Sequence, residues 1–280
     1  MIKLVLSDMD NTLLPFGSHQ VSDRARAAIA EVRAAGIQFG PATGRDYVEL
    51  MRFFAGDESC FSTGLLSNGK KVVVDGDVRR LSLVDNAALQ RFADRIADRD
   101  DCFVTAYPFE TTLENPVYCI GVTQEVAEVW GRRFAFDPRI ADRVPDEKLI
   151  GGTFACPGTQ ADLDELKAIG TELCPEFDFI QPVPNWVDIV PAGVNKGSSL
   201  GALLDELGIS SDEVVFFGDA ENDLQIMEKV ENSVAVANAT PAAAAAARWH
   251  IGSSADDSVA AALEDIARSA REGRLPSFMR

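Results

Sequence analysis

The sequence predicts an α/β protein in which a Rossmann-like parallel sheet core is interrupted by an inserted α+β cap domain. Two observations lead to this prediction. Strand and helix patterns alternate at both ends of the chain, whereas several strand patterns in the middle follow one another without helices between them. We therefore expect a core made of residues 1–83 and 191–280, and a cap made of residues 84–190.

The N-terminal part of the core has the pattern of a strand, a helix and a second strand. Residues 2–6 form a short, mainly apolar run without clean alternation, which is typical of a strand buried on both faces of a parallel sheet. Ser22 can cap a helix that runs to Ala35, with Gly36 behind it. Residues 37–39 form the next expected strand. This segment is therefore a βαβ unit.

The middle of the chain departs from this alternation. Asp75-Gly76 between two β-prone runs predicts a hairpin over residues 71–81. Beyond the hairpin we expect helices at residues 87–98 and 160–173, and strands at residues 102–106, 117–122, 149–155, 177–180 and 186–190. This mixture predicts a smaller α+β domain.

Strand and helix patterns alternate again near the C-terminus. In order, we expect a helix at 197–207 ended by Gly208, a strand at 214–217, a helix around 222–229, a strand at 233–236, and a helix that begins at Pro241. Both ends of the chain therefore contribute to one sheet.

The overall charge limits the partners of the chain. Its 280 residues include 26 Lys and Arg and 44 Asp and Glu, so the formal net charge is 26 − 44 = −18. Such a surface repels phosphate backbones and anionic lipid head groups, because proteins bind both largely through Lys and Arg. We therefore expect neither a nucleic-acid partner nor a membrane-surface partner.

Cysteine usage and the N-terminus predict a cytoplasmic location. The five Cys, at positions 60, 102, 119, 156 and 174, form no C-x-x-C pair and accompany only two His. This pattern argues against a zinc site and against a disulfide framework, so we expect reduced thiols. The N-terminus turns acidic at Asp8 before an apolar signal core could form, and no run approaches the ~18 apolar residues of a membrane span.

Four segments carry the residues suited to chemistry, and all follow expected strands or begin expected helices. Asp8 and Asp10 follow the first strand, and we expect both carboxylates to reach one point because residues i and i+2 share a face. Thr43-Gly44-Arg45 follows the second strand, and Asp219–Asp223 follows a later one. Asn195-Lys196-Gly197 begins a helix, where free N–H groups and a Lys favour an anion. Ligands of open α/β sheets bind at this edge.

The charges of these side chains point to a phosphate site with a metal ion. Acids gathered at one edge repel one another unless a cation lies between them, and Mg²⁺ prefers one or two carboxylates, waters and a phosphate oxygen. Asp8, Asp10, Asp219 and Asp223 carry −4 when ionised, and Mg²⁺ with Lys196 returns +3. A protonated Asp10 would make the site neutral, so a phosphate monoester could bind.

Taken together, the four segments resemble the motifs of the haloacid dehalogenase-like (HAD) phosphohydrolases, in particular the Cof-type branch with a large C2 cap. The motifs read D-x-D-x-T-L from Asp8, A-T-G-R from Ala42, N-K-G from Asn195 and G-D-x-x-N-D from Gly218. The resemblance covers nearly the whole chain. Asn11 stands where Gly is commonest in the family, and Asn tolerates a left-handed backbone better than most residues.

The resemblance implies a role for each motif residue. It implies catalysis by Asp8 as nucleophile and Asp10 as general acid and base; substrate or phosphate binding by Met9, Thr43, Gly44, Lys196 and Asn222; Mg²⁺ binding by Asp8, Asp10 and Asp219; and support of the metal site by Asn222 and Asp223. Two further residues have two interpretations each. Arg45 could contact substrate or form a structural ion pair, and Asn68 could lie beside the site or belong to a plain turn.

The expected function is a Mg²⁺-dependent phosphatase that hydrolyses small phosphorylated metabolites, sugar phosphates above all, through an aspartyl-phosphate. A phosphomutase or phosphotransferase with the same intermediate remains an alternative. The intact set of Asp8, Asp10, Lys196 and Asp219 argues against a Mg²⁺-dependent binding protein without chemistry. A serine hydrolase, suggested by G-x-S-x-G at Gly197–Gly201, is rejected because no strand leads directly into the serine. We expect a monomer or a weak homodimer.

Overall fold

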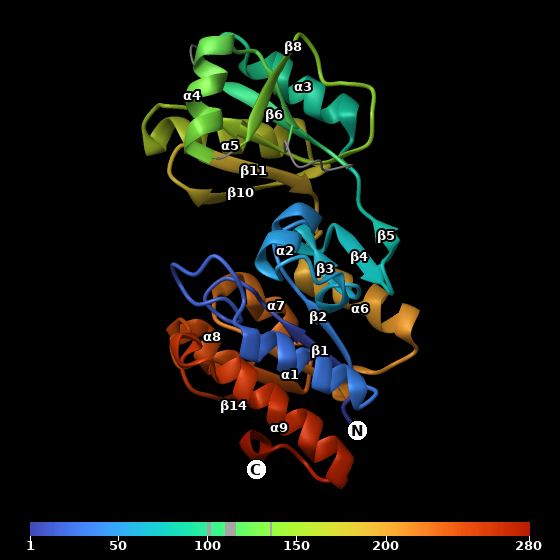
Figure 1. Cartoon of the computed structure of the whole chain (residues 1–280). Helices are drawn as coiled ribbons and strands as arrows, with labels where there is room; N and C mark the ends of the chain where they lie inside the picture. The colour runs from blue at the N-terminus through green and yellow to red at the C-terminus, as the bar shows by residue number, and fades with distance from the viewer. Residues whose placement is uncertain (100–101, 110–115, 135) are drawn as a thin grey trace. The chain divides into compact units, whose positions relative to one another are not determined.

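A computed structural model describes residues 1–99, 102–109, 116–134 and 136–280 (Figure 1). The chain divides into two compact units. The core unit consists of Met1–Leu81 and Asn195–Arg280, and the cap unit consists of Ser82–Val194. The expected boundaries at residues 83 and 191 differ from these by a few residues on each side.

The core unit is built on a five-stranded parallel sheet with the order β14-β13-β12-β1-β2. Its strands are β1 (Leu4–Ser7), β2 (Gln38–Pro41), β12 (Val214–Gly218), β13 (Asn232–Ala235) and β14 (Trp249–His250). The predicted parallel sheet, made from both ends of the chain, is confirmed. Because β12 and β2 flank β1 in parallel, the loops that follow these three strands leave the same edge of the sheet.

Helices cover both faces of this sheet (Figure 1). On one face lie α1 (Asp23–Ala34) and α9 (Ser258–Glu272), which pack against Val5, Val215 and Phe217. On the other face lie α6 (Lys196–Leu207), α7 (Leu224–Met227) and α8 (Pro241–Ala246), which pack against Leu4, Leu6 and Phe216. Successive strand residues thus enter opposite cores, which is why these strands show no polar alternation.

The capping residues expected for two of these helices occupy their places. Ser22 Oγ accepts a hydrogen bond from the N–H of Ala25 at 3.0 Å, and Gly208 ends α6 in the left-handed conformation. The helix α9 has no counterpart among the expected elements, and the Asp257 side chain that precedes it caps none of its N–H groups. The helix expected around 222–229 is shorter, because a 3₁₀ turn at Glu221–Asp223 comes before α7.

A small antiparallel sheet completes the core unit. It contains β3 (Gly64–Leu66), β4 (Lys71–Val74) and β5 (Asp77–Leu81), and helix α2 (Tyr47–Phe53) precedes it. Asp75 and Gly76 both have positive φ angles, of 52° and 86°, which confirms the predicted tight hairpin. Single 3₁₀ turns lie at Glu58–Cys60, Ser67–Gly69, Ser211–Glu213, Ser254–Asp256 and Ser277–Met279.

The cap unit has a six-stranded sheet with the order β10-β11-β9-β6-β7-β8. Its strands are β6 (Phe103–Pro108), β7 (Pro116–Ile120), β8 (Asp137–Ala141), β9 (Leu149–Ala155), β10 (Phe177–Val183) and β11 (Trp186–Pro191). Helices α3 (Asn86–Ile96) and α5 (Gln160–Leu173) pack on one face. On the other face lies α4 (Gln124–Phe134), which joins the parallel pair β7 and β8. The expected α+β composition holds, with α4 and β8 as additional elements.

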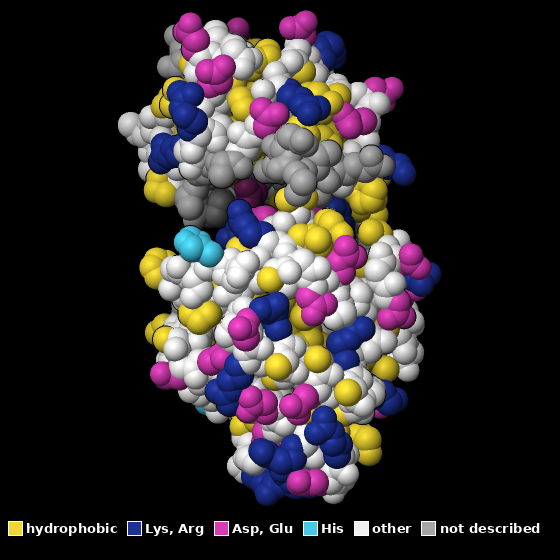
Figure 2. All heavy atoms as spheres, viewed as in Figure 1, with side chains coloured by type: hydrophobic (Ala, Val, Ile, Leu, Met, Phe, Trp, Pro, Cys, Tyr) yellow, Lys and Arg dark blue, Asp and Glu magenta, His cyan; other side chains and the backbone are white. Residues whose placement is uncertain are grey.

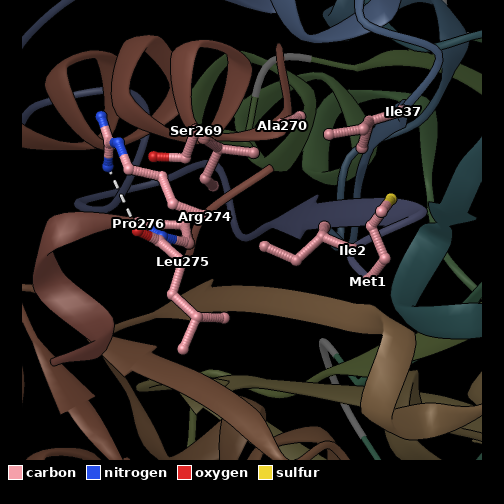
Figure 3. A pocket seen from close by; sticks show the side chains of 9 residues that line it. Met1, Ile2, Ile37, Ser269, Ala270, Arg274, Leu275 and Pro276 are labelled. Carbon is pink, nitrogen blue, oxygen red and sulfur yellow. Dashed lines mark hydrogen bonds between the residues drawn. The ribbon is translucent and has the colours of Figure 1, made fainter. Parts of the chain in front are cut away.

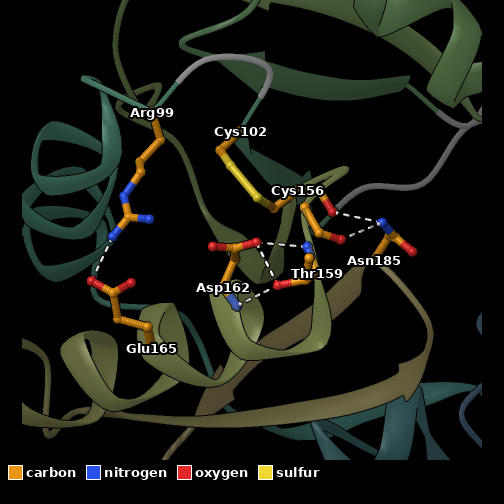
Figure 4. Close-up of a disulfide and its surroundings, with 8 residues drawn as sticks. Arg99, Cys102, Cys156, Thr159, Asp162, Glu165 and Asn185 are labelled. Atoms are coloured by element: carbon orange, nitrogen blue, oxygen red, sulfur yellow. Dashed lines mark hydrogen bonds and ion pairs between the residues drawn. A yellow bond between two sulfur atoms is a disulfide. The ribbon is translucent and has the colours of Figure 1, made fainter.

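Cys102 and Cys156 form a disulfide in the cap unit (Figure 4). The expectation that all five thiols are reduced is therefore wrong for this pair. Phe103 of β6 lies opposite Ala155 of β9, so the two neighbouring Cys face each other across the ends of an antiparallel pair, with Cα atoms 4.3 Å apart. Their separation of 54 residues conceals this pairing in the sequence. Cys60, Cys119 and Cys174 are free and buried.

Charged side chains of both signs lie on the face of the molecule that Figure 2 shows. On the face shown in Figure 2, Lys and Arg side chains of the described residues are interspersed with Asp and Glu in each unit. Among the described residues, no helix has both the length and the apolar character needed to cross a membrane.

Candidate active site

The segments singled out in the sequence meet at one edge of the core sheet. Asp8 directly follows β1, Asp219 directly follows β12, and Thr43 lies two residues beyond β2. The N–H of Asp8 donates to the carbonyl of Phe217 at 2.8 Å, so the parallel pairing continues to Asp8. Lys196 is the first residue of α6, whose N-cap Asn195 accepts from the N–H of Ser198 at 2.8 Å.

Lys196 is a buried cation that joins two buried carboxylates. Its Nζ donates to Asp8 Oδ1 at 2.5 Å and to Asp223 Oδ1 at 2.8 Å, and only 1% of the residue is exposed. Burial alone would lower the pKa of Lys196, but Asp8 and Asp223 outweigh it and raise this pKa above its ordinary value. The ammonium group therefore remains charged.

Three buried carboxylates lie close enough to share one cation. Asp8, Asp219 and Asp223 each offer an oxygen, and these atoms lie within 4.8 Å of one another. Burial raises the pKa of Asp8 to about 7, and Lys196 offsets only part of this effect because Asp223 and Asp219 add repulsion. Burial also raises the pKa of Asp219. When all three acids are ionised, the single Lys196 ammonium, which is bonded to Asp8 and Asp223, leaves a net charge of −3 + 1 = −2.

Asp223 holds this arrangement together. Its Oδ2 accepts hydrogen bonds from the N–H groups of Asp219 at 3.0 Å and Ala220 at 3.3 Å, while its Oδ1 accepts from Lys196. A Cβ at Gly218 would lie 2.6 Å from Asp223 Oδ2, so only glycine permits this close approach. Because both oxygens of Asp223 already accept hydrogen bonds, this residue is better suited to supporting the site than to coordinating a metal ion directly.

Thr12 is a site residue that the sequence analysis did not assign. Its Oγ1 donates to Asp219 Oδ1 at 3.0 Å, and the residue is 1% exposed. This bond orients Asp219 toward Asp8. Its position in the D-x-D-x-T-L motif, four residues after Asp8, is the feature of the sequence that could have identified Thr12.

Asp10 does not join the group of three carboxylates, so the expectation that Asp8 and Asp10 reach one point is not met. Strand β1 ends at Ser7, and the chain then curls so that the N–H of Leu14 reaches the carbonyl of Met9 at 2.7 Å. The alternation of side chains in a strand therefore stops before Asp10. Asn11 takes the left-handed conformation in this turn, with φ of 66°.

The carboxylate of Asp10 instead makes a two-pronged ion pair with Arg45. Arg45 Nε lies 2.9 Å from Asp10 Oδ2, and Arg45 Nη2 lies 3.0 Å from Asp10 Oδ1. Arg45 Nη1 donates to Glu49 Oε1 at 2.7 Å. The bond to Asp10 raises the pKa of Arg45. Of the two interpretations of Arg45, the ion pair is the one that the structure contains.

The remaining predicted site residues differ in their burial and in which of their groups could contact a ligand. Thr43 is buried and its Oγ1 accepts from the N–H of Arg45 at 3.1 Å, while Gly44 is exposed. The side chain of Met9 is buried in the core, so only its backbone could contact a ligand. Asn222 is exposed, and its side chain makes no hydrogen bond with the residues that the structure describes.

The serines of the G-x-S-x-G pattern have structural roles. Ser198 Oγ accepts from the N–H of Asn195 at 2.9 Å within the capping box of α6. Ser199 Oγ donates to the carbonyl of Gly69 at 2.7 Å. Neither serine lies on the strand-to-helix elbow that a serine hydrolase needs.

One small pocket of the core unit lies away from this site (Figure 3). It has a volume of about 50 Å³ and is lined by Met1, Ile2, Ile37, Ile266, Ser269, Ala270, Arg274, Leu275 and Pro276. Arg274 is its charged lining residue, and the Nη1 of that residue donates to the carbonyl of Leu275 at 3.1 Å. Because Met1 and Ile2 precede β1, the pocket is at the amino end of this strand, whereas Asp8 follows its carboxyl end.

The acidic group fits a hard divalent cation. The Oδ2 of Asp8 has no hydrogen-bond partner among the described residues, and oxygen ligands of this kind are those that Mg²⁺ prefers. An ion of charge +2 would balance the residual charge of −2. Asp8 and Asp219 are the residues best placed to hold it.

Comparisons with known proteins show which sequences and which fold this chain is similar to. A sequence model of the haloacid dehalogenase-like hydrolases matches residues 5–263. An HMP-PP phosphatase from Citrobacter koseri is 28% identical over 251 residues, which are 86% of this chain and 86% of that protein. A 5-amino-6-(5-phospho-D-ribitylamino)uracil phosphatase from Escherichia coli is 26% identical over 277 residues, or 95% and 96% of the two chains. The solved structure of BT1666 from Bacteroides thetaiotaomicron superposes with a TM-score of 0.76 at 21% identity, covering 95% of each chain.

Proposed function

The chain belongs to the haloacid dehalogenase-like hydrolase family, and we propose that it is a Mg²⁺-dependent phosphatase of small phosphorylated metabolites. The family and the hydrolase class expected from the motifs are thereby confirmed. The observation that carries the proposal is the buried Lys196, which bridges Asp8 and Asp223 beside Asp219. Such a cation–carboxylate group suits the binding and transfer of a phosphoryl group.

Asp8 is the proposed nucleophile. Its Oδ1 is held by Lys196, so the orientation of its carboxylate is set before a substrate arrives. Attack by this carboxylate on phosphorus would form an aspartyl-phosphate and release the alcohol, and water would then hydrolyse the intermediate. Lys196 would stabilise charge on the phosphoryl oxygens. Bound Mg²⁺, held by Asp8 and Asp219, would neutralise charge on the phosphate and on the acids.

Asp10 is the proposed general acid and base, and its role as a metal ligand stays a prediction. It is 51% exposed in its ion pair with Arg45. Both oxygens of Asp10 are engaged by Arg45, so the proposed exchange of a proton with substrate and water requires Asp10 to release Arg45. Arg45 is then a positioning residue that retains Asp10 beside the site between turnovers. Thr43, Gly44 and the backbone of Met9 complete the proposed phosphate-binding set, with Asn222 as its exposed member.

Sugar and polyol phosphates are the proposed substrates, and the cap unit is the proposed source of selectivity. The name of the Escherichia coli relative describes a phosphate carried by a ribityl group, which is a substrate of this kind. The net charge of −18 disfavours large anionic partners such as nucleic acids. We extend the proposal to a monomer or weak homodimer. The Cys102–Cys156 disulfide removes the cysteine argument for a cytoplasmic location, which stays a prediction.

Release of inorganic phosphate from a panel of esters tests the proposal. The panel should include sugar phosphates, the ribityl phosphate named above and p-nitrophenyl phosphate, each assayed with Mg²⁺. Phosphate release that is lost in the Asp8→Asn variant is the expected result. Absence of release from every ester, or full release by Asp8→Asn, would overturn it. Transfer of the phosphoryl group to a second sugar without release of phosphate would favour the phosphotransferase alternative.

A further inference from the structure

A strained turn lies directly beside the proposed phosphate site. Ser67, Asn68 and Gly69 follow one another with φ angles of 51°, 57° and 85°, all in the left-handed region. Left-handed backbone is costly for most residues with a side chain, although less so for Asn, and it rarely continues over several residues. Strain of this kind persists only where surrounding contacts impose it, and it is concentrated at functional sites.

Tertiary contacts on both sides impose this conformation. The N–H of Asn68 donates to the carbonyl of Thr43 at 2.8 Å, and the N–H of Ser67 donates to the carbonyl of Arg45 at 3.0 Å. On the other side, the carbonyl of Gly69 accepts from Ser199 Oγ at 2.7 Å. A Cβ at Gly69 would lie 2.5 Å from the carbonyl oxygen of Asn195. The turn therefore ties the loop of Thr43 to the first turn of α6, which carries Lys196.

The turn directs the carboxamide of Asn68 over Gly44. A Cβ built on Gly44 would lie 3.1 Å from Asn68 Nδ2 and 3.2 Å from Asn68 Oδ1. Neither this carboxamide nor the N–H of Gly44 has a hydrogen-bond partner among the described residues. The Oγ1 of Thr43 accepts the N–H of Arg45, which leaves its own proton free to be donated. Three hydrogen-bond donors thus lie close together: Thr43 Oγ1 and the N–H of Gly44 on one loop, and Asn68 Nδ2 on the neighbouring turn.

We propose that Asn68 is a further phosphate-binding residue, whose Nδ2 donates to a phosphoryl oxygen beside Thr43 and Gly44. This inference rests on the proposed function. Its physical basis is that the left-handed turn at residues 67–69 holds the unpaired carboxamide of Asn68 beside the loop of Thr43 and Gly44, which would bind the phosphate. A plain turn would not require the side chain.

Replacement of Asn68 by glycine separates the side chain from the backbone. Glycine adopts positive φ without strain, so Asn68→Gly keeps the turn and removes only the carboxamide. A hydrogen bond to a charged group accounts for roughly a tenfold change in affinity or more. We therefore expect the KM for p-nitrophenyl phosphate and the inhibition constant of inorganic phosphate to rise together about tenfold, with kcat changed by less than about threefold. Asp75→Gly is the matched control, because Asp75 is also left-handed, with φ of 52°, but lies in the hairpin between β4 and β5.

The outcomes distinguish this inference from the proposed function. Unchanged KM and phosphate inhibition in Asn68→Gly, with a normal urea unfolding midpoint, would overturn the inference. A raised KM with unchanged phosphate inhibition would also overturn it, since the contact would then be to the leaving group. Calorimetric titration with inorganic phosphate and Mg²⁺ needs no turnover. If the wild type hydrolysed no ester but bound phosphate about tenfold more tightly than Asn68→Gly, the inference would stand and the proposed function would fall.

Discussion

Substitution of Lys196 by methionine tests whether this buried cation holds the acidic group together. Methionine keeps much of the length of the side chain but removes the charge. Methionine leaves Asp8 and Asp223 without their buried counter-charge. These residues are 6% and 0% exposed, and their Oδ1 atoms lie 2.5 and 2.8 Å from Lys196 Nζ. Removing one partner of a buried ion pair costs about 3–5 kcal/mol. We expect Lys196→Met to lose about that much free energy of unfolding at pH 8 in the absence of metal.

The matched control makes the same substitution at an exposed pair. Lys3 Nζ lies 2.8 Å from Glu213 Oε1, but 53% of the Lys3 side chain is exposed. Exposed pairs contribute about 0–1 kcal/mol, so Lys3→Met should scarcely change stability. Urea unfolding followed by circular dichroism measures both variants, and Mg²⁺ should restore part of the loss only in Lys196→Met. A loss within about 1 kcal/mol of that in Lys3→Met would refute the argument that burial makes this pair strong.

Three further predictions concern catalysis, metal dependence and acid stability. In stopped-flow experiments with p-nitrophenyl phosphate, Asp8→Asn should give no burst of nitrophenolate, whereas Asp10→Asn should keep the burst. With a sugar phosphate, Asp10→Asn should lose about 10²–10⁴-fold in rate, because this leaving group needs a proton donor. Equal losses with both leaving groups would show that the role of Asp10 is wrong. Dialysis against a chelator should abolish phosphate release and added Mg²⁺ should restore it, while undiminished turnover in the chelator would contradict the metal assignment. Burial would raise the pKa of Asp265, but the N–H of Ser277 and the Arg268 guanidinium hold it at about 2. A lowered pKa stabilises the fold above the unfolded value of 3.8, and this stabilisation is lost as the pH falls toward 2. Asp265→Asn should therefore cost about 2 kcal/mol at pH 5 and about 1 kcal/mol at pH 3 in urea unfolding, and a cost that grew on acidification would reverse the sign of the argument.

Local patterns in the sequence were sufficient to predict most of the architecture. The uniformly apolar runs that became β1 and β12 are buried by helices on both faces, and such runs are distinctive over short stretches. Ser22 and Gly208 lie where they were expected because capping depends on neighbouring residues alone. The motif residues Asp8, Lys196 and Asp219 could be named because each lies at a strand or helix end that the pattern identifies.

Only the tertiary structure decided how these side chains are partnered. The sheet order places β1 beside β12, a strand that lies far from it in the sequence, and this brings Asp8 near Asp223. The packing of α6 on the same sheet then brings Lys196 to both carboxylates. In the same unit, the path of the loop after β1 decides that Asp10 pairs with Arg45. In the cap unit, the pairing of β6 with β9 decides that Cys102 meets Cys156. Periodicity and spacing describe which face a residue occupies within its own element. Contacts between elements depend on strand order and loop path, which no short stretch of sequence contains.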